Sequence, residues 1–375
     1  MLKRVLLIAT VQSHICQFHK PLVEMLHERN CEVHVAARNN LAEKNGLKLD
    51  FVEQVFDVPF QRLPFSLNNL KAYFQLKRII RDGNYNVVHC NTPVGGVLGR
   101  LAARHARRHG TKVIYTAHGF HFYKGSPKKN WAIWYPIEKF MSRFCDVLIT
   151  INEEDFSFAK EHFSGDVEHI HGVGVREDRY HPVSYEDQLE MRRREGLKED
   201  DFVVICTGEL NENKNQKTLI SAAAILREKI PSLKVLLAGN GPNEQELQDQ
   251  ISAEHLGNIV RLLGYRTDLE HVVPAVDVVV SCSKREGLPL NIVEAMLCKK
   301  PVVASINRGN SELVEDGKSG FLLEPENVNG FADCLIRINA DKQMAEQFGE
   351  AGYRKAQGYT VKAVKKELAT ILFGE

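Results

Sequence analysis

The segment that determines the fold is residues 276–296, VDVVVSCSKREGLPLNIVEAM. Its β-branched start, Val276–Ser281, predicts a buried strand, and the pattern from Leu290 to Leu297 predicts a helix. Between them, the Gly-Leu-Pro sequence at 287–289 predicts a turn. This strand–turn–helix unit is typical of parallel α/β sheets, in which ligands bind at the carboxyl ends of the strands. The loop after the strand is therefore a candidate binding loop.

The same alternation of short apolar runs and longer amphipathic stretches extends along the whole chain. Strands that are apolar throughout are buried on both faces, as in parallel sheets. The predicted strands are Val5–Ala9, Glu32–Ala36, Val87–His89, Val113–Thr116, Val147–Ile151, Asp201–Cys206, Lys234–Ala238, Ile259–Leu263, Val276–Ser281 and Pro301–Ala304. The predicted helices are Phe18–Arg29, Leu67–Asp82, Gly96–His109, Gln216–Lys229, Asn243–Glu254 and Leu290–Leu297. We therefore predict an α/β protein with two Rossmann-like, doubly wound parallel-sheet domains.

A domain boundary is predicted in the charged stretch Tyr180–Asp200, whose first part lacks apolar periodicity. We expect an N-terminal domain over 1–180, a C-terminal domain over 181–360 and a C-terminal helix over 361–375. The first 185 residues hold 25 Lys and Arg against 18 Asp and Glu, net +7, and the remainder holds 24 against 30, net −6. A basic N-terminal half indicates an anionic partner, such as a phosphorylated substrate, nucleic acid or a lipid surface.

Composition excludes several classes of protein. The 375 residues are 43% hydrophobic and 26% charged, as in soluble globular proteins. No run of apolar residues is long enough for a transmembrane helix, and the apolar N-terminal run ends at Thr10, too early for a signal peptide. Eight scattered cysteines without a C-x-x-C pair predict neither a disulfide framework nor a zinc site. We expect a cytoplasmic protein.

Two carboxylates are predicted to converge in the C-terminal domain, Glu286 in the turn and Glu294 on the following helix. The N–H groups of Leu290 and Asn291 have no intrahelical acceptor, so the start of this helix is an anion site. The competing interpretation makes Glu286 a partner of the helix dipole and Glu294 a surface residue.

Three further loops follow strands of this domain and should face the same crevice. Gly208 permits a tight turn after the first strand, and Lys214 near the next helix can act as a point charge on a phosphate. The other two loops contain Asn240-Gly241 and Gly264-Tyr265.

Histidines follow two strands of the N-terminal domain. His118 comes directly after a buried strand and before a glycine. Two interpretations of this histidine are equally supported, a contact to the substrate and a core histidine. His14 is interpreted as lining a substrate site and Cys16 as packing, because the spacing of the Ser13–His19 segment fits no standard zinc pattern.

A G-G-x-x-G run opens a helix after the strand Val87–His89. It is weak evidence for a dinucleotide site. In a dinucleotide-binding motif the glycines follow the first strand and an acidic residue lies downstream, and this run has neither feature. Gly96 and Arg100 on this helix are candidates to hold an anionic acceptor group.

Basic and aromatic residues interleave at 120–135, which contains both tryptophans. Lys128 and Lys129 beside Trp131 and Trp134 are typical of a membrane-interface segment. The alternative is an amphipathic helix that docks on its own domain. Nucleic acid is not expected as a partner, because no motif accompanies the charge.

Taken together, the chain resembles the retaining GT-B glycosyltransferases of family 4 over essentially its whole length. Glu286 and Glu294 reproduce the E-x7-E signature of that family, including the Gly-Leu-Pro start and the Glu-Ala-Met ending. His171–Val175 matches the entry to the interdomain linker. The chain is most similar to transferases of bacterial capsule, exopolysaccharide and O-antigen assembly.

The resemblance implies two domains that face each other across a cleft, and a role for each site residue. Glu294 would hold the ribose of a nucleotide sugar, Glu286 would contact the transferred sugar, and Lys214 would bind phosphate. The implied donor-binding set is Gly208, Glu209, Lys214, Asn240, Gly241, Tyr265, Glu286, Gly287, Leu288, Pro289, Leu290, Asn291 and Glu294. The implied acceptor-binding set is His14, Gly96, Arg100 and His118, and the implied catalytic residues are Glu286, His118 and Lys214.

Two residues depart from the family pattern. Glu209 stands where an arginine usually binds the diphosphate, and Arg176 replaces the aspartate of the linker. A carboxylate would repel a diphosphate, so Glu209 is expected to point elsewhere or to meet a substrate hydroxyl.

The resemblance implies a metal-independent transferase without a cofactor, and the chain contains no Asp-x-Asp motif. Its donor would be a UDP-hexose or UDP-N-acetylhexosamine, and its acceptor a lipid-linked saccharide. It would work at the inner face of the cell membrane, in peripheral contact with anionic lipid. The alternatives are an inactive sugar-nucleotide-binding subunit, a GT-B-like nucleotide-sugar epimerase and a nicotinamide-dependent dehydrogenase.

Overall fold

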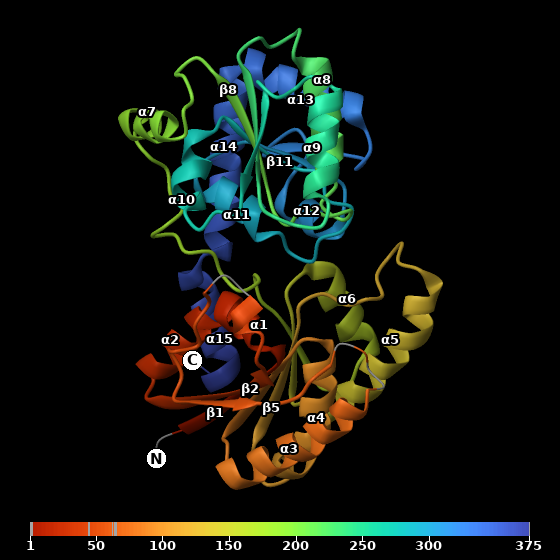
Figure 1. Ribbon diagram of the computed structural model, residues 1–375. Helices are drawn as coiled ribbons and strands as arrows, with labels where there is room; N and C mark the ends of the chain where they lie inside the picture. The colour runs from red at the N-terminus through yellow and green to blue at the C-terminus, as the bar shows by residue number, and fades with distance from the viewer. Residues whose placement is uncertain (1–2, 44–45, 62, 64–65, 375) are drawn as a thin grey trace. The chain divides into compact units, whose positions relative to one another are not determined.

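The chain forms two compact units (Figure 1). The structure is a computed structural model that describes residues 3–43, 46–61, 63 and 66–374. Unit 1 comprises the residues up to Gly174 together with the segment from Val361 onward, and unit 2 is Val175–Thr360. Each unit has its own sheet and core.

Unit 1 is built on a parallel seven-stranded sheet with the order β3-β2-β1-β4-β5-β6-β7. Its strands are β1 (Lys3–Val11), β2 (Cys31–Arg38), β3 (Gln54–Asp57), β4 (Val87–Asn91), β5 (Lys112–Ala117), β6 (Val147–Thr150) and β7 (Asp166–His169). Its helices are α1 (Gln12–Phe18), α2 (Lys20–Glu28), α3 (Leu67–Gly83), α4 (Pro93–Arg107), α5 (Lys128–Met141), α6 (Glu153–His162) and α15 (Val361–Phe373), with 3-10 turns η1 (Leu41–Glu43) and η2 (Ser142–Phe144).

Unit 2 is built on a parallel six-stranded sheet with the order β10-β9-β8-β11-β12-β13. Its strands are β8 (Phe202–Thr207), β9 (Leu233–Ala238), β10 (Val260–Gly264), β11 (Val278–Ser281), β12 (Val302–Ser305) and β13 (Gly320–Leu323). Its helices are α7 (Tyr185–Arg194), α8 (Gln216–Leu226), α9 (Glu244–Ala253), α10 (Leu269–Val272), α11 (Leu290–Leu297), α12 (Arg308–Leu313), α13 (Val328–Ala340) and α14 (Lys342–Ala356), with 3-10 turns η3 (Val273–Ala275) and η4 (Gln357–Tyr359).

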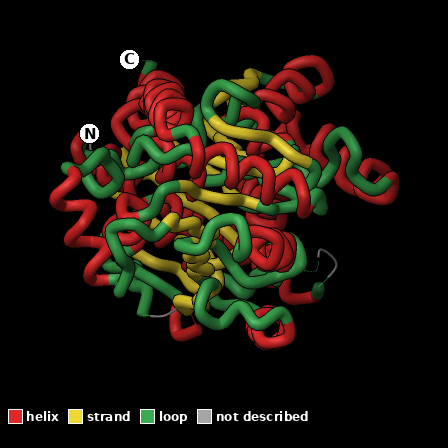
Figure 2. Tube along the Cα trace, turned by 90° about the horizontal axis from the view of Figure 1, so that it is seen from above, coloured by secondary structure: helices red, strands yellow, loops and turns green. Residues whose placement is uncertain are grey.

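Red helices surround the yellow strands in Figure 2, and in unit 2 the two faces of the sheet pack in different apolar clusters. In unit 2 every residue of β8 is buried, and alternate side chains enter different cores. Val204 packs in the same cluster as Leu219 of α8, whereas Val203 packs in the cluster that contains Ile292 of α11. Because successive side chains of a strand point to opposite faces, an unbroken apolar strand needs cover on both sides. The predicted doubly wound α/β architecture is therefore confirmed for both units.

Each sheet has a point at which the order of the strands reverses. In unit 1 the reversal lies between β1 and β4, and in unit 2 it lies between β8 and β11. The loops that leave the carboxyl ends of these neighbouring strands diverge, and they leave room for a ligand between them. The two loops at this point in unit 2 are those that contain Lys214 and Glu286.

The boundary between the units differs from the one predicted after residue 180. Val175 already pairs with Thr360 within unit 2, and Tyr180 is buried in the same cluster as Leu197. Their apolar contacts draw this segment into the core of unit 2, although its sequence lacks periodicity. At the other end, α15 belongs to unit 1, where it packs against α2.

One predicted helix begins two residues later in the structure. The predicted helix Phe18–Arg29 corresponds to α2, which begins at Lys20, and Phe18 is the last residue of the short preceding helix α1. Pro21 lies in the first turn of α2. Proline has no N–H to continue a helix through this point, so a break precedes it. In the described part of the chain, no helix is long and apolar enough to cross a membrane.

Candidate functional site

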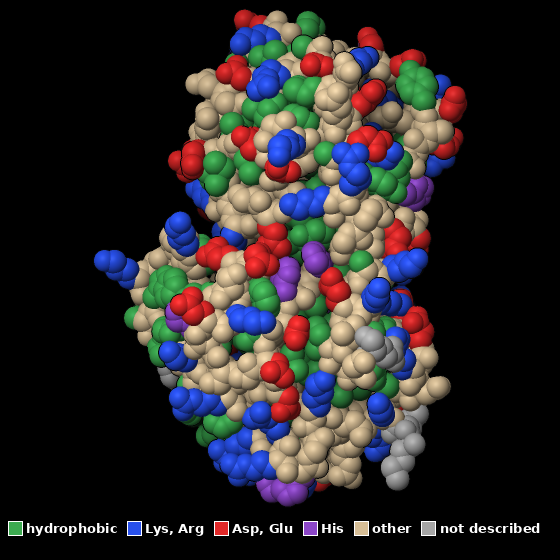
Figure 3. All heavy atoms as spheres, turned by 180° about the vertical axis from the view of Figure 1, so that it is seen from behind, with side chains coloured by type: hydrophobic (Ala, Val, Ile, Leu, Met, Phe, Trp, Pro, Cys, Tyr) green, Lys and Arg blue, Asp and Glu red, His purple; other side chains and the backbone are tan. Residues whose placement is uncertain are grey.

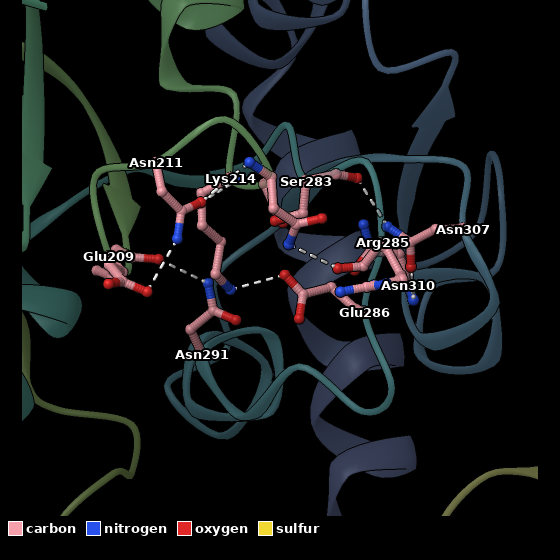
Figure 4. Close-up of polar contacts among 12 residues, drawn as sticks. Glu209, Asn211, Lys214, Ser283, Arg285, Glu286, Asn291, Asn307 and Asn310 are labelled. Carbon is pink, nitrogen blue, oxygen red and sulfur yellow. Dashed lines mark hydrogen bonds and ion pairs between the residues drawn. The ribbon is translucent and has the colours of Figure 1, made fainter. Parts of the chain in front are cut away.

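An ion pair joins the two loops at the switch point of unit 2 (Figure 4). The Nζ atom of Lys214, after β8, donates to Oε1 of Glu286, after β11, over 2.6 Å. The lysine side chain is 22% exposed and the glutamate side chain 13%. A pair that is mostly shielded from water interacts more strongly than a surface pair. The structure thus brings together two of the residues that the sequence singled out.

Hydrogen bonds and a glycine hold Lys214 in place. Asn211 Oδ1 accepts the backbone N–H groups of Asn213 and Lys214, at 3.0 and 2.9 Å. Gly208 has a φ of +142°, and a Cβ atom on it would lie 3.1 Å from Cε of Lys214. The glycine therefore leaves space for the lysine side chain to run toward Glu286.

The loop after β9 packs against this segment backbone to backbone. A Cβ atom on Gly239 would lie 1.9 Å from the carbonyl oxygen of Gly208, and one on Gly241 would lie 2.3 Å from that of Leu210. The carbonyl of Asn240 accepts the N–H of Leu210 at 2.9 Å. Gly241 thus serves close packing of the two loops, and the Asn240 side chain is left exposed.

Helix α11 begins beside this ion pair without a side-chain cap. Its N-cap residue is Pro289, and the N–H groups of Leu290 and Asn291 find no acceptor among the described residues. Asn291 Nδ2 donates to the carbonyl of Thr207 at 3.1 Å, which ties the start of the helix to the end of β8. The free N–H groups and the helix dipole make a positive end that suits an anion.

The other predicted donor residues lie around this helix start or at its side. Gly287, Leu288 and Pro289 form the turn before α11, and a Cβ atom on Gly309 of α12 would lie 2.9 Å from Gly287 O. Tyr265 follows β10 with about half of its surface exposed. The turn residues Gly287–Pro289 and Tyr265 take part in no ion pair, because none of them carries a charged side chain at neutral pH.

Glu209 does not contact the lysine. Its Oε2 atom accepts Asn211 Nδ2 at 2.9 Å, and its backbone carbonyl accepts Gln216 Nε2 at 3.0 Å. The carboxylate that departs from the family pattern is therefore held within its own loop (Figure 4).

Glu294 lies on α11, and its surroundings differ from those of Glu286. Burial raises its pKa to about 7, a nearby Arg179 lowers it, Glu270 raises it, and a hydrogen bond with Tyr180 lowers it. Arg179 is itself paired with Glu270 at 2.6 Å. The two carboxylates of the E-x7-E motif thus have different partners, Lys214 for one and the Arg179–Glu270 pair with Tyr180 for the other.

Replacing Glu294 with glutamine should change how stability depends on pH. A carboxyl group with a raised pKa holds its proton in the folded state between about pH 4.5 and 7, while the unfolded chain has released it. The free energy of unfolding of the wild type should therefore fall by about 3 kcal/mol as pH rises through this window. Urea unfolding at several pH values should show a smaller fall in Glu294→Gln.

The matched control is Glu346→Gln, an exposed residue on α14, and this variant should lose as much stability as the wild type over the same pH window. If Glu294→Gln and the wild type lose the same stability between pH 4.5 and 7, the buried state of this carboxyl group is refuted.

In unit 1 the structure brings together the two histidines predicted to contact substrate. His14 on α1 and His118 after β5 have their Nε2 atoms 3.3 Å apart, and His118 Nε2 lies 3.2 Å from Asn91 Oδ1. Burial lowers the pKa of His118 to about 4, so its imidazole is neutral at neutral pH.

The structure contradicts the assignment of Arg100 and Gly96 to acceptor binding. The Arg100 side chain is fully buried, and its Nη2 donates to Oε2 of Glu138 at 2.8 Å. Its guanidinium lies 3.8 Å from the ring centroid of Tyr115, whose hydroxyl donates to Oε1 of Glu138. A Cβ atom on Gly96 would lie 2.4 Å from the Tyr115 ring. Both residues are used inside the core, where a substrate cannot reach them.

A cavity of about 190 Å³ lies next to this buried pair. It is lined by Thr92, Pro93, Tyr115, His118, Gly119, Phe120, His121, Phe122, Trp134 and Glu138. The rings of His121 and Trp134 stack at 4.8 Å. Sequence reasoning identified only His118 of this set as a site residue, because the others come from segments whose contact depends on the tertiary fold.

The packing of the two tryptophans favours a helix docked on its own domain over a membrane-interface segment. Trp131 lies 5.4 Å from Phe122 and 5.5 Å from Phe158 between ring centroids. Trp134 is half-buried against His121, and both tryptophans pack against the core of unit 1. The exposed large apolar residues of α5 are Ile133 and Phe140 instead.

Two doubly wound units, with a lysine, a carboxylate and an uncapped helix start at the switch point of the second, define the GT-B class of glycosyltransferase. Residues 187–355 match the family model described as glycosyl transferases group 1, and residues 4–152 match the model described as glycosyl transferase 4-like. The chain belongs to this family of glycosyltransferases.

Relatives of known name and solved structures agree with this membership. The chain is 44% identical, over 99% of its length and 96% of the relative, to the putative glycosyltransferase EpsD of Bacillus subtilis. It is 29% identical over 81% of its length to the UDP-Gal:alpha-D-GlcNAc-diphosphoundecaprenol alpha-1,3-galactosyltransferase of Escherichia coli, covering 80% of that protein. The crystal structure of Anabaena HepE in complex with UDP superposes over the full length of both chains with a TM-score of 0.81 and 25% identity.

Proposed function

We propose that the protein is a retaining, metal-independent hexosyltransferase that moves a sugar from a UDP-sugar to a lipid-linked saccharide in cell-surface polysaccharide synthesis. The observation that carries the proposal is the Lys214–Glu286 pair beside the uncapped start of α11. The E. coli relative, named for UDP-Gal and a diphosphoundecaprenol acceptor, and the UDP complex of HepE support the choice of donor and acceptor.

The diphosphate is the leaving group of such a transfer, and negative charge builds up on it as the sugar departs. Lys214 and the N–H groups of Leu290 and Asn291 would stabilise this charge in fixed positions. Among the described residues, the one group of three or more His, Cys, Asp or Glu side chains that could hold a metal lies in unit 1. The positive charge offered to the diphosphate would come from Lys214 and from the start of α11.

The two carboxylates would divide the rest of the donor between them. Glu286 would accept hydrogen bonds from hydroxyls of the transferred sugar once the diphosphate draws Lys214 away from it. Glu294 would hold the ribose, and exposed Tyr265 would stack on the base. Retention would follow from attack on the same face of the sugar, with the departing phosphate accepting the proton of the acceptor hydroxyl.

Unit 1 would bind the acceptor in the cavity that His118 lines. A saccharide ring can pack on the aromatic side chains of this cavity, and its hydroxyls can reach His118. His14 would line the same region through its contact with His118.

The test is transfer from a panel of UDP-hexoses and UDP-N-acetylhexosamines to an undecaprenyl-diphosphate-linked saccharide in the presence of EDTA. We expect product with one donor, and NMR of the new linkage should show the anomeric configuration of that donor. Product with inverted configuration would refute retention. Binding of UDP without any transfer would favour an inactive sugar-nucleotide-binding subunit.

Helix α3 supports peripheral contact of unit 1 with an anionic membrane. Its exposed Leu67, Leu70 and Phe74 are spaced on one face. Lys and Arg side chains gather at the lower end of unit 1 in Figure 3, where Figure 1 places α3 and α4. Apolar side chains beside basic ones on a helix are typical of binding at a membrane interface.

A triple variant should no longer co-sediment with phosphatidylglycerol vesicles. It combines Leu67→Ser, Leu70→Ser and Phe74→Ser. Each of these side chains contributes about 1.5–3 kcal/mol when it enters an apolar environment, so the loss of three removes most of the binding energy. The control is Ile133→Ser, Phe140→Ser, which removes exposed apolar side chains from α5. Unchanged sedimentation of the α3 variant would rule out contact through this helix.

A further inference from the structure

We propose that Asn91 is a positioning residue for His118. It holds the imidazole in the tautomer that carries the proton on Nε2, so that Nδ1 is the atom that accepts a hydrogen bond from a substrate hydroxyl. The role of Nδ1 toward a substrate rests on the proposed function. The tautomer is a property of unit 1 alone, and it can be measured without any substrate.

The fold brings Asn91 to His118 at the switch point of unit 1. Strand β4 lies between β1 and β5 in the sheet, and Asn91 is its last residue. Asn91 pairs in register with Thr116 of β5, two residues before His118, and His14 follows β1 on α1. Because the carboxyl ends of parallel strands share one edge of the sheet, the three side chains meet there.

The loop after Asn91 is held in a conformation that few residues adopt. Thr92 has a φ of +64°, which is uncommon for a residue other than glycine. Its Oγ1 atom accepts the backbone N–H of Thr10 at 3.0 Å and lies 2.7 Å from Thr10 Oγ1. Backbone strain of this kind persists only where the surroundings fix it, so the end of β4 is rigid beside His118.

His118 has a single ring proton to place. Burial lowers its pKa to about 4, so the ring is neutral at neutral pH. The titratable groups that face it are His14, His19 and His89, and burial lowers the pKa of each of them as well. A neutral imidazole donates through one nitrogen and accepts through the other. The position of the proton therefore decides what His118 can offer a substrate.

The Asn91 amide decides this position. Its Oδ1 atom lies 3.2 Å from His118 Nε2, and its Nδ2 donates to the carbonyl of His89 at 3.4 Å. If the amide were turned over, its oxygen would face the His89 carbonyl, and two acceptors would meet without a hydrogen between them. Asn91 is fully buried, so this mismatch would be costly. The atom that faces His118 can only accept, and Nε2 must donate.

His14 agrees with this assignment but cannot make it alone. Its Nε2 atom lies 3.3 Å from His118 Nε2, and two ring nitrogens at this distance share one proton, which either ring can supply. With the proton on His118, the N–H is shared between Asn91 Oδ1 and His14 Nε2, a three-centre bond. Without Asn91 the direction of the contact between the two histidines would no longer be fixed.

The other nitrogen of His118 remains for a ligand. Both hydrogen-bond contacts of the ring use Nε2, and Nδ1 has no such partner among the residues that the structure describes. The residue is partly exposed and lines the cavity of about 190 Å³. A nitrogen without a proton accepts from a hydroxyl and offers nothing to a carboxylate or phosphate oxygen. The tautomer thus selects a group that can donate, such as a saccharide hydroxyl.

The test is nitrogen-15 NMR of full-length protein labelled at histidine, at neutral pH and without substrate. Protonated and unprotonated ring nitrogens have well separated chemical shifts, and the variant His118→Gln identifies the signals of His118. We expect Nε2 to be protonated and Nδ1 unprotonated. The matched control is Thr116→Val, which removes the hydroxyl 2.7 Å from His89 Nε2. It should shift the signals of His89 and leave those of His118 in place.

In Asn91→Leu the ring-nitrogen shifts of both His14 and His118 should move toward values between the two forms, because the shared proton loses its fixed direction. Asn91→Asp keeps an acceptor oxygen, so His118 should keep its proton on Nε2, and the carboxylate should raise the pKa of His118 above about 4. If Asn91→Leu does not fold, this rise in pKa carries the test. A protonated Nδ1 in the wild type, or unchanged shifts in folded Asn91→Leu, overturns the proposal.

Sugar transfer tests the role toward substrate. Asn91→Leu should transfer about 10-fold more slowly than Thr116→Val, as the loss of one hydrogen bond at a buried group predicts. Equal rates for the two variants would overturn this role of His118 Nδ1. If no form of the protein transfers sugar while the wild type shows the expected tautomer, the proposed function fails and the action of Asn91 on His118 is supported.

Discussion

Replacing Lys214 with alanine is expected to lower the turnover number for sugar transfer by about 10²–10³-fold, the usual cost of losing one fixed donor to a developing negative charge. Two effects combine at this position. The diphosphate loses its cation, and Glu286, 13% exposed, is left with a negative charge that no longer has its partner. The uncompensated carboxylate would then repel the leaving group that the site must stabilise.

The matched control is Lys217→Ala, three residues further along the same segment. Lys217 pairs with Glu212 at 3.3 Å on the surface, where such pairs contribute little. We expect this variant to keep near wild-type turnover. Equal rates for the two alanine variants would show that Lys214 has no part in transfer.

Replacing Arg100 with methionine is expected to lower the free energy of unfolding by about 3–5 kcal/mol, because removal of one partner leaves a buried charge without compensation. The remaining Glu138 is buried, and it would keep only the hydroxyl of Tyr115. Urea unfolding followed by circular dichroism measures the loss.

Two further variants make this test specific. Arg107→Met breaks the pair with Asp146, which is about one-third exposed, and should cost about 1 kcal/mol or less. The double variant Arg100→Met, Glu138→Leu removes both charges and should recover much of the stability, because an apolar pair of similar volume can replace a buried ion pair. A loss for Arg100→Met as small as that for Arg107→Met would contradict the buried pair.

The central strands could be predicted from sequence, whereas three edge strands could not. β8 and β11 are buried at every position, so their apolar runs mark them clearly. β3, β7 and β13 lie at edges of their sheets and are partly exposed. An edge strand such as β7, with the sequence DVEH, does not need a continuous apolar run.

The same distinction separates the predicted from the missed site residues. The turn from Glu286 to Asn291 is local in sequence, so its strand–turn–helix context and its free N–H groups could be predicted. Arg100 and Glu138 are 38 residues apart, and nothing in either segment indicates that they pair. His19 is only the second residue of the predicted helix Phe18–Arg29, and its approach to His118 depends on the break before Pro21.

The most direct test of the proposed donor site is calorimetric titration of UDP into the protein in the presence of EDTA. We expect one equivalent to bind, and Lys214→Ala to bind about 10–100-fold more weakly, as the loss of one charged hydrogen bond predicts. Binding that appears only after Mn²⁺ or Mg²⁺ is added, or binding that is equal in the wild type and Lys214→Ala, would contradict a diphosphate site built from Lys214 and the start of α11.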